Sequence, residues 1–337
     1  MATIKEVAER AQVSVATVSR VINGTGFVSP DLEQRVREAM ETLNYQPSAL
    51  GRSLRRRETL TIGLLIPQID HPFFSAFAAA IESALFQHDY RTFICSSEED
   101  GTRERSAIDI LLQQRVDGVI YVPTGQHPQY VTRFKDASVP VVLVDRDLNA
   151  DHVDKVLSAN EEGGYMGIQH LLAHGHRKIG IVGTTPYSEA MVARMSGVKR
   201  ALSEAELDIP TRHIIMEKGK QFELGYRSAH DLLTTQQPPT AIFALTDVIA
   251  IGVLHGASQL GRQLPHDLSV MGFDDIPLAG YSIPTLTTIA QPIYDMGATA
   301  TSLLLSRIKE PDREPETVVL PVSLVARDSV AFVEPTS

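Results

Sequence analysis

The sequence contains a single cysteine, Cys95, among its 337 residues. One cysteine excludes an intrachain disulfide and fits a reducing cytoplasm. No apolar run reaches the length of a membrane span, and the first ten residues carry charges where a secretory signal would need an apolar stretch. We therefore expect a cytoplasmic protein without membrane attachment. Because Cys95 lies in the apolar run TFIC, we expect a buried and inert thiol.

The motifs of several enzyme classes are also missing. The chain has no GxGxxG after a predicted strand, no GxxxxGK[ST], no GxSxG and no HExxH. An enzyme on a Rossmann-like sheet would need a phosphate loop or a nucleophile with its base, and we find neither. His170 and His174 have a metal-binding spacing on a helix, but Gly175 is expected to end that helix and turn His176 away. We predict no enzyme, no cofactor and no metal site, and a favourably basic helix C-terminus at these histidines.

Basic residues are fewer than acidic residues, and the charges are unevenly distributed along the chain. The net charge is −10, yet residues 1–60 carry nine basic and seven acidic residues. Between Asn44 and Arg57 there are four arginines and no acid. A mildly basic head on an acidic body suggests a local site for a polyanion, although a short arginine run is more often a solvated linker.

The head has the pattern of three short helices. Thr3, with a glutamate three residues later, predicts a capped helix over residues 4–11. After a tight turn, Ser14 predicts the cap of a second helix that reaches about residue 22, where Asn-Gly ends it. A third helix is expected after Ser29 and runs through residue 43.

The second helix is expected to bury Val18, Val21 and Ile22. Its outer face then holds small, uncharged side chains and one long donor, Arg20, which suits bidentate contact with guanine in a major groove. Two short helices, a tight turn and a packing helix are typical of a helix-turn-helix. From these residues alone, an ordinary three-helix bundle is an equally good interpretation.

The segment ATIKEVAERAQVSVATVSRVING, followed by VSPDLEQRVREAMETLNYQPSALGRSLRRRET, resembles the head of the lac/galactose repressor (LacI/GalR) family almost throughout. The resemblance implies that the second helix reads the major groove of an operator. It implies base contacts from Val15, Ala16 and Arg20. The full DNA-binding set expected in the head is Thr3, Ser14, Val15, Ala16, Thr17, Ser19, Arg20 and Asn23.

The same resemblance identifies residues 47–55 as a hinge helix that folds on the operator. In the family it wedges a leucine, here Leu54, into the minor groove, and the neighbouring Arg52 and Arg55 would hold phosphates. The alternative for Leu54 is a plain linker residue. The sequence departs from the family at Ser48 and at Gly51, where alanine is usual, and glycine inside a helix costs about 1 kcal/mol relative to alanine.

Beyond residue 59, apolar runs alternate with helical periods. Such runs separated by helices predict parallel sheets covered on both faces, and their number favours two doubly wound α/β lobes. The predicted strands are residues 61–67, 92–97, 118–123, 140–145, 178–184, 241–247 and 268–275, with late strands near 286–292 and 317–326 that return between the lobes. The expected domains are a head (1–46), a hinge (47–58) and a body (59–337), with one lobe at 59–159 and 290–320 and the other at 160–289 and 321–337.

Ligands of parallel α/β sheets bind beyond the carboxyl ends of the strands. The segments that follow these strands are rich in carboxylates, arginine, amides and aromatic rings, a mixture that suits a polyhydroxylated ligand. An aspartate after a strand also caps the next helix, and for Asp247 capping is at least as good an interpretation. Ser96 is a further candidate at the mouth of the site.

Segments such as HPFFS, VPVVLVDR, LLAHGHRKIGIVG and LSVMGFDD resemble the effector domain of the same family, which is itself similar to periplasmic sugar-binding proteins. The ligand contacts that the resemblance implies are Phe73, Phe74, Asp145, Arg146, Arg194, Phe222, Thr246, Asp274 and Gln291. The purine-responsive branch has an arginine where this chain has Ser188, which favours a sugar such as ribose or another pentose or hexose.

Together these patterns predict a homodimeric repressor of a palindromic double-stranded operator, controlled by a small sugar-like effector. Dimerisation is expected because one head covers only a half-site. Without a terminal leucine heptad, a coiled-coil tetramer is not expected. The alternatives are a purine- or sugar-phosphate-responsive relative, a sugar-binding module without a DNA role, which residues 1–57 disfavour, and an enzyme.

Overall fold

The computed structural model describes residues 2–45, 58–125, 127–185 and 188–333. The chain forms two compact units, residues 1–61 and 62–337, each with a hydrophobic core of its own. The predicted hinge contacts Arg52, Leu54 and Arg55 lie outside the described residues. Within the described residues, no helix has both the length and the apolarity needed to cross a membrane.

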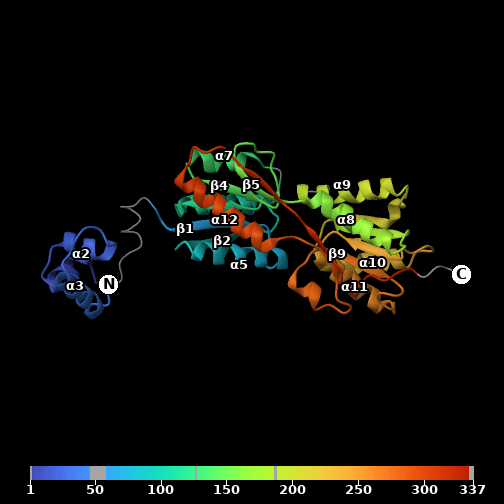
Figure 1. The fold of residues 1–337 in the computed structure, drawn as a ribbon, viewed down its shortest axis with the longest axis horizontal. Helices are drawn as coiled ribbons and strands as arrows, with labels where there is room; N and C mark the ends of the chain where they lie inside the picture. The colour runs from blue at the N-terminus through green and yellow to red at the C-terminus, as the bar shows by residue number, and fades with distance from the viewer. Residues whose placement is uncertain (1, 46–57, 126, 186–187, 334–337) are drawn as a thin grey trace. The chain divides into compact units, whose positions relative to one another are not determined.

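The head consists of three helices, α1 (Ile4–Ala11), α2 (Val15–Asn23) and α3 (Pro30–Thr42), seen in blue in Figure 1. The predicted caps are confirmed. Thr3 and Glu6 form a reciprocal capping box, and the Ser14 hydroxyl accepts a hydrogen bond from the Thr17 amide at 3.1 Å. Gly24 ends α2 in the left-handed conformation, which glycine adopts without steric cost.

One apolar side chain from each helix is fully buried at the centre of the head. These residues are Val7, Val18 and Val36. Their burial follows from the 3.6-residue period of the apolar positions, which leaves the opposite face of each helix in solvent.

The body contains two six-stranded sheets (Figure 1). The first has the strand order β11-β5-β4-β3-β1-β2 and the second has the order β12-β10-β9-β8-β6-β7. The strands of the first sheet are β1 (Thr61–Ile66), β2 (Arg91–Ser96), β3 (Gly118–Tyr121), β4 (Val141–Val144), β5 (Asp154–Ser158) and β11 (Thr317–Leu320). Those of the second are β6 (Ile179–Thr184), β7 (Ile214–Glu217), β8 (Ala241–Ala244), β9 (Ser269–Asp274), β10 (Thr287–Ala290) and β12 (Ser323–Val325).

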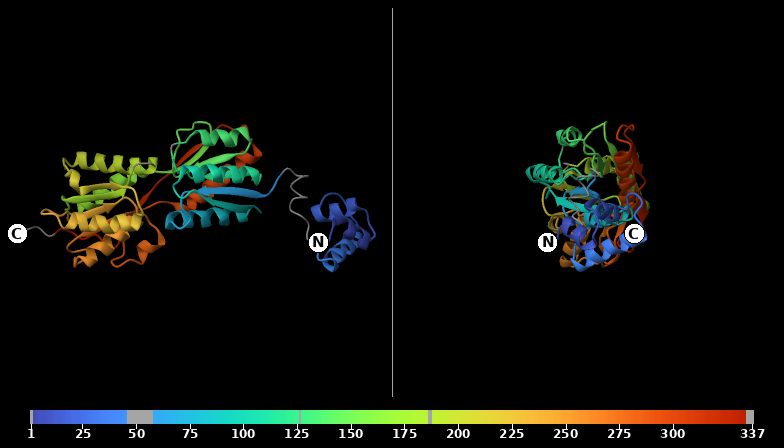
Figure 2. Two further views of the ribbon diagram at one scale, coloured as in Figure 1. Left: turned by 180° about the vertical axis from the view of Figure 1, so that it is seen from behind. Right: turned by 90° about the vertical axis from the view of Figure 1, so that its left-hand side faces the viewer.

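Helices cover both faces of each sheet, as the reverse view also shows (Figure 2). In the first lobe, α5 (Pro72–Phe86) and α12 (Ile293–Lys309) pack on one face, and α6 (Gly101–Gln113) and α7 (Gln129–Asp136) on the other. In the second lobe, the pairs are α10 (Gln221–Leu233) with α11 (Asp247–Gln259), and α8 (Asn160–Ala173) with α9 (Glu189–Glu204). Two short 3₁₀ helices, η1 (Thr211–His213) and η2 (Pro277–Gly280), complete the second lobe.

The chain crosses between the lobes three times. The crossings lie between β5 and α8, between β10 and α12, and between β11 and β12. The predicted late strand near 317–326 is thus two strands, one in each sheet, and its passage is visible as the long red segment in Figure 1. The two lobes are therefore joined by three separate segments of the chain.

Two strands were absent from the prediction. β5 begins with Asp154 and Lys155, which are buried because each has a charged partner, so this strand does not read as apolar. β7 is a short, half-buried strand at the end of its sheet. Apart from β12, the other strands of the body begin within two residues of the predicted bounds. The sheets are parallel except for the antiparallel pair of β10 and β12.

The expectation for Cys95 was wrong in part. The residue is half-buried rather than buried, because β2 is the edge strand of its sheet and has several exposed positions. Burial still raises the pKa of the thiol above its ordinary value, which disfavours the reactive thiolate.

Candidate functional site

A cavity of about 690 Å³ lies between the two lobes of the body. The described residues that line it come from the segments following β1, β2, β3 and β4 in the first lobe, and from those following β6, β7, β8, β9 and β10 in the second. These are carboxyl ends of strands, where ligands of parallel α/β sheets bind.

All nine predicted ligand contacts line this cavity: Phe73, Phe74, Asp145, Arg146, Arg194, Phe222, Thr246, Asp274 and Gln291. Ser96, Asp247 and Asp275 also follow strands, but they do not line the cavity. Ser96 donates to the Pro67 carbonyl and the Glu98 carboxylate, and Asp275 pairs with Arg327 at 2.7 Å. The hydrogen-bond partners of the Asp247 side chain, Ile276 and Thr288, do not line the cavity either.

Asp247 neither contacts the cavity nor caps α11. The cap is Thr246, whose hydroxyl accepts from the Ile249 amide at 3.3 Å. The fully buried Asp247 carboxylate instead accepts from the Thr288 hydroxyl at 2.6 Å and the Ile276 amide at 2.9 Å. Burial, together with the neighbouring Asp274, raises its pKa well above the ordinary value.

Arg194 on α9 is the central cation of the cavity. It is 4% exposed and its Nη2 lies 3.1 Å from Asp274 Oδ1. Its Nε donates to Asn160 Oδ1 at 2.8 Å, and its Nη1 donates to the Leu245 carbonyl at 2.6 Å. The guanidinium carbon lies 3.7 Å from the centre of the Phe273 ring. A cation with this many partners is held in one orientation, which suits a binding residue.

The approach of α8 to α9 places Arg194. A Cβ on Gly164 would lie 2.0 Å from the Arg194 carbonyl oxygen, and one on Gly197 would lie 1.8 Å from the Glu161 carbonyl oxygen. Only glycine permits two helix backbones to approach so closely. Gly164 and Gly197 therefore allow the helix contact that brings Arg194 to the cavity.

Asp145 and Arg146 end β4 on the opposite lobe. Arg146 donates to both carboxylate oxygens of Glu99, at 3.0 and 2.8 Å, and to the Pro123 carbonyl at 3.0 Å. Its guanidinium lies 5.6 Å from the centre of the Phe74 ring. Asp145 is 6% exposed, and its nearest cationic atom is Arg146 Nε at 3.7 Å.

The two cavity aspartates have unusual backbone conformations. The φ angle is +65° at Asp145, in the left-handed region that single aspartates tolerate, and +118° at Asp274, outside that region. Strained backbone of this kind concentrates at functional sites. Burial raises the pKa of both carboxyls, while Arg146 and Arg194 oppose the rise at Asp145 and Arg194 opposes it at Asp274.

Aromatic rings form the apolar part of the lining. Phe73 and Phe74, both buried, are 5.2 Å apart in an edge-to-face arrangement, and Phe222 is 42% exposed on the other lobe. Rings beside carboxylates and guanidinium groups can cover the apolar face of a sugar while the polar groups bind its hydroxyls.

His71 and Gln221 also line the cavity, although neither was among the predicted ligand contacts. His71 Nε2 lies 3.2 Å from Gln221 Oε1, which joins the first lobe to the second, and Gln221 Oε1 also accepts from the Thr246 hydroxyl at 2.7 Å. The sequence placed His71 in a segment after a strand, but nothing in it indicated a partner 150 residues away.

The outer face of α2 in the head presents Val15, Ala16 and Arg20, all of which are exposed. Thr17 is half-buried, and the Thr3 and Ser14 hydroxyls are occupied as helix caps. Asn23 is the last residue of α2.

The expectation that Ser19 lies on the outer face of α2 was wrong. Ser19 is 6% exposed because it is adjacent to the buried Val18 and three residues before Ile22, on the side of the helix that faces α1 and α3. Val15, Ala16 and Arg20, the three residues expected to contact base edges, remain exposed.

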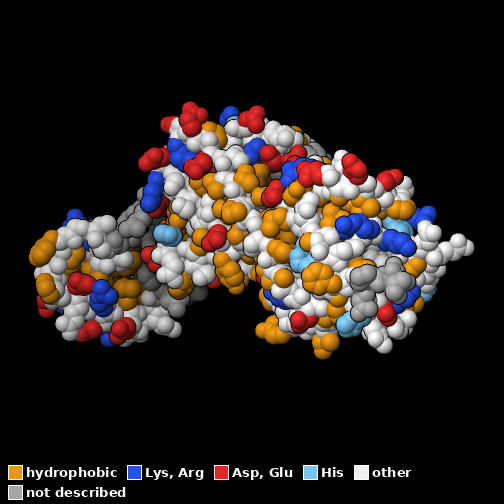
Figure 3. Space-filling model, turned by 45° about the vertical axis from the view of Figure 1, so that its right-hand side comes forward, with side chains coloured by type: hydrophobic (Ala, Val, Ile, Leu, Met, Phe, Trp, Pro, Cys, Tyr) orange, Lys and Arg blue, Asp and Glu red, His pale blue; other side chains and the backbone are white. Residues whose placement is uncertain are grey.

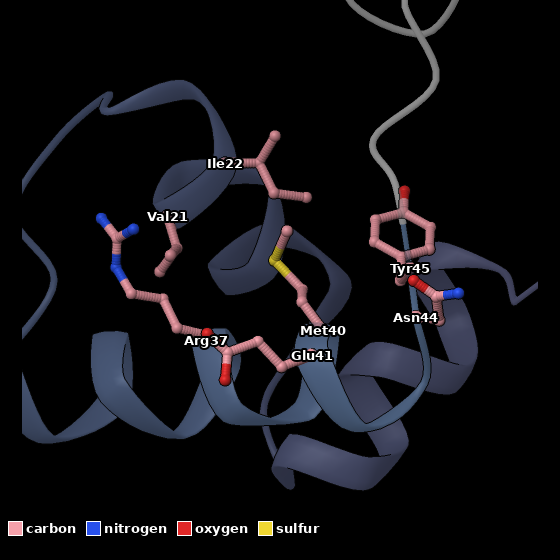
Figure 4. Close-up of a pocket in the computed structure, with 7 residues that line it drawn as sticks. All are labelled: Val21, Ile22, Arg37, Met40, Glu41, Asn44 and Tyr45. Atoms are coloured by element: carbon pink, nitrogen blue, oxygen red, sulfur yellow. The ribbon is translucent and has the colours of Figure 1, made fainter.

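A second hollow, of about 430 Å³, lies between the end of α2 and α3 (Figure 4). Val21 and Ile22 of α2 face Met40 of α3 across it, and Tyr45 stands at its edge (Figure 4). These side chains also pack against the buried residues of the head, so the hollow is the open margin of its core.

The histidines in and after the last turn of α8 have contacts within the chain. His176 Nδ1 lies 3.0 Å from the Thr240 hydroxyl and its Nε2 lies 3.1 Å from the Ala331 carbonyl. Burial lowers the pKa of His170 and of His176 to about 4. The expected favourable basic charge at this helix end is wrong for His170, which is neutral at pH 7 because charging it would require desolvation of the cation.

Comparison with known proteins gives the family. Residues 3–48 match "Bacterial regulatory proteins, lacI family", and residues 168–330 match "Periplasmic binding protein-like domain". The ribose operon repressor of Haemophilus influenzae is 39% identical over 98% of this chain and 99% of its own length. The chain belongs to the LacI family.

A second relative is also named as a transcriptional repressor. The HTH-type transcriptional repressor PurR of Aliivibrio salmonicida is 37% identical over 98% of this chain and 99% of its own length. LacI-family proteins are transcriptional regulators, so this chain is a regulator and not an enzyme.

Solved LacI-family structures share the fold. The lac repressor dimer bound to operator and an anti-inducer is 28% identical, with a TM-score of 0.87 over 98% of this chain and 99% of that chain. A LacI-family regulator from Enterococcus faecium with bound ribose is 32% identical, with a TM-score of 0.74 over 81% of this chain and all of that chain. The predicted fold class, a helix-turn-helix head with a two-lobed α/β body, is confirmed.

Proposed function

We propose that this LacI-family regulator is a repressor that binds a palindromic operator and is controlled by a sugar, ribose or a closely similar pentose or hexose, held between the two lobes. The observation that carries the proposal is the convergence of Asp145, Arg146, Arg194 and Asp274 with aromatic rings on one cavity. Carboxylates and guanidinium groups bind paired hydroxyls, and the rings cover the apolar face of a sugar.

A free sugar is preferred over a purine. Ser188 stands where the purine-responsive branch has an arginine, and in this chain its hydroxyl is used to cap α9, accepting from the Met191 amide at 3.2 Å. A relative named for a ribose operon and a neighbour with bound ribose support the same preference, whereas the relatives named PurR are the reason to include purines in any screen.

The proposed mechanism couples the cavity to the operator. A ligand that touches both lobes has a different affinity for each relative rotation of the lobes, so its binding shifts their equilibrium. In a dimer, that rotation changes the separation of the two hinges at residues 47–58 and so the fit of two heads to two half-sites.

Homodimerisation is part of the proposal. Leu278, Tyr281 and Ile283 are 52%, 82% and 95% exposed in and after η2, an unusual exposure for a run of large hydrophobic residues. The space-filling view also shows hydrophobic side chains gathered on both lobes (Figure 3). Burial of such a patch in a second copy removes it from water.

The proposal also includes the remaining expectations from the sequence. They are operator contacts from the residues named in the head and hinge, a division into head, hinge and body at residues 46/47 and 58/59, and a cytoplasmic, nucleoid-associated location. The division of the chain at residues 61/62 supports the separation of head from body.

Selection of duplex DNA from a random library by the full chain, followed by sequencing, tests the proposed function. We expect enrichment of a palindrome with two half-sites, and we expect Arg20→Ala to relax the preference at one base pair in each half-site. Enrichment of no sequence, or of one that Arg20→Ala leaves unchanged, would contradict operator reading by α2.

A further inference from the structure

The turn between α1 and α2 contains a left-handed residue that is not glycine. Gln12, the residue after α1, has a φ angle of +50° and a ψ angle of +48°. Glycine adopts this conformation without steric cost, whereas a side chain such as that of glutamine is disfavoured in it. The conformation at Gln12 is therefore one that contacts with the rest of the head must hold in place.

Backbone amides of the turn satisfy part of the C-terminus of α1. The Gln12 amide donates to the Glu9 carbonyl at 3.1 Å, and the Val13 amide donates to the Ala8 carbonyl at 2.9 Å. The Ala11 carbonyl immediately before Gln12, and the carbonyl of Gln12 itself, are bonded instead by a side chain from a distant part of the head.

That side chain is Arg35, on α3. Its Nη2 donates to the Ala11 carbonyl at 2.6 Å and to the Gln12 carbonyl at 3.4 Å. One carbonyl precedes the Cα atom of Gln12 and the other follows it, so a single guanidinium group spans the left-handed residue. Arg35 is half-buried, and a cation at this point is also favoured by the negative end of the α1 dipole.

The helix that carries Arg35 packs on both other helices of the head. Val36, the next residue of α3, is fully buried in one cluster with Val7 of α1 and Val18 of α2. Arg35 therefore ties the turn to the helix against which α1 and α2 are already packed. A rotation about the backbone bonds of Gln12 would swing α2 as a unit, together with its exposed face.

We infer that Arg35 is a positioning residue for operator reading, which holds the turn at Gln12 in the conformation that presents α2 to the major groove. Arg35 acts through the turn and does not read bases itself. The inference rests on the proposed function and adds to it a residue outside the set expected to contact the operator. The competing role for an arginine in a DNA-binding head is a phosphate contact, which gives affinity without sequence preference.

The ratio of specific to non-specific DNA affinity distinguishes these roles. Arg35→Met and its matched control Arg37→Met each remove one positive charge from α3, and Arg37 is exposed and pairs with Glu33 of the same helix. The full-length proteins are titrated by fluorescence anisotropy, at several salt concentrations, with the palindrome that wild type selects and with a scrambled duplex of equal length. We expect Arg35→Met to lower the ratio about tenfold with the salt dependence of wild type, and Arg37→Met to leave the ratio within about twofold.

A ratio for Arg35→Met within about twofold of wild type would overturn the inference. If both affinities fell alike and the slope of log affinity against log salt fell by about 1, Arg35 would be a phosphate contact. If both fell alike with an unchanged slope, Arg35 would only stabilise the folded head.

A measurement without DNA tests the link between Arg35 and Gln12. Hydrogen–deuterium exchange of the full chain follows the amides of residues 3–23 in wild type, Arg35→Met, Gln12→Gly and the double variant. Because glycine adopts the left-handed conformation freely, Gln12→Gly removes the need for support. We expect Arg35→Met to accelerate exchange about tenfold in wild type and at most about threefold in the Gln12→Gly background. Equal acceleration in both backgrounds would overturn the link.

The two measurements also separate this inference from the proposed function. Absence of any sequence preference in wild type would contradict operator reading, while the exchange rates would still decide whether Arg35 holds the turn. A wild type that selects a palindrome, with an Arg35→Met variant of unchanged ratio, would contradict the inference alone.

Discussion

Arg194 and Asp274 form a buried ion pair, with Nη2 of the arginine 3.1 Å from Oδ1 of the aspartate. They join helix α9 to the end of strand β9 within the second lobe, and both face the cavity. The ion pair neutralises the Asp274 carboxylate and holds both side chains in fixed positions at the cavity surface.

Arg194→Met should be costly to the fold. It leaves the Asp274 carboxylate buried without its cation, which predicts a loss of about 3–5 kcal/mol in the free energy of unfolding. Arg200→Met removes two exposed ion pairs, to Glu161 and Glu162, and should cost at most about 1 kcal/mol. Urea denaturation of the full chain measures both, and equal losses would show that burial does not set the value of the Arg194 pair.

Asp247 should make stability depend on pH. Its pKa is raised above the ordinary 3.8, chiefly by burial, so the folded state holds this proton more tightly than the unfolded state does. The associated stability is fully present below about pH 4 and is lost as the pH rises through the folded-state value.

The Asp247→Asn variant isolates this effect. The free energy of unfolding of wild type minus that of the variant should decrease as the pH rises from 4 toward 7, because only wild type loses the proton. Urea titrations at several pH values give this difference, and a difference that increases over the same range would contradict a raised pKa.

Arg20 should contribute sequence preference in the head. Arg20→Ala should weaken operator binding by about 1–3 kcal/mol, since a bidentate contact with guanine has that value. Arg37→Ala on α3 removes an exposed arginine that pairs with Glu33 and is the matched control. Fluorescence anisotropy with the selected operator measures both, and comparable losses would indicate that Arg20 supplies charge without base recognition.

Ile283 should belong to the dimer surface. It is 95% exposed, so Ile283→Asp leaves the fold of the monomer unstrained while placing a charge in an apolar contact. We expect sedimentation to show a dimer for wild type and a monomer for the variant. The secondary structure of the monomeric variant should unfold at the same temperature as that of dilute wild type. A dimeric variant would place the contact between copies elsewhere.

The patterns that predicted the fold are local ones. Thr3 and Ser14 mark helix starts by a cap that needs only the next three residues, and the apolar runs of β1, β4 and β9 identify buried strands. β5 was not predicted because its first residue, Asp154, is buried through ion pairs with Arg307 and Arg313. Both arginines lie more than 150 residues later in the sequence.

The site was predictable to the same extent. The rule that ligands bind beyond strand ends selected Asp145 and Asp274 without any knowledge of their neighbours. It could not separate them from Asp247 and Asp275, since all four follow strands and only tertiary contacts decide which carboxylates face the cavity. His71 contacts Gln221 on the other lobe, and no local sequence pattern predicts that contact.

The central claim is that the cavity and the operator are coupled, and its most direct test is an operator titration of the full chain with and without a saturating free sugar. The account predicts that the sugar changes operator affinity by about 5- to 150-fold, that operator changes sugar affinity by the same factor, and that Arg194→Met abolishes both effects. A sugar that binds the cavity and leaves operator affinity unchanged would contradict the account.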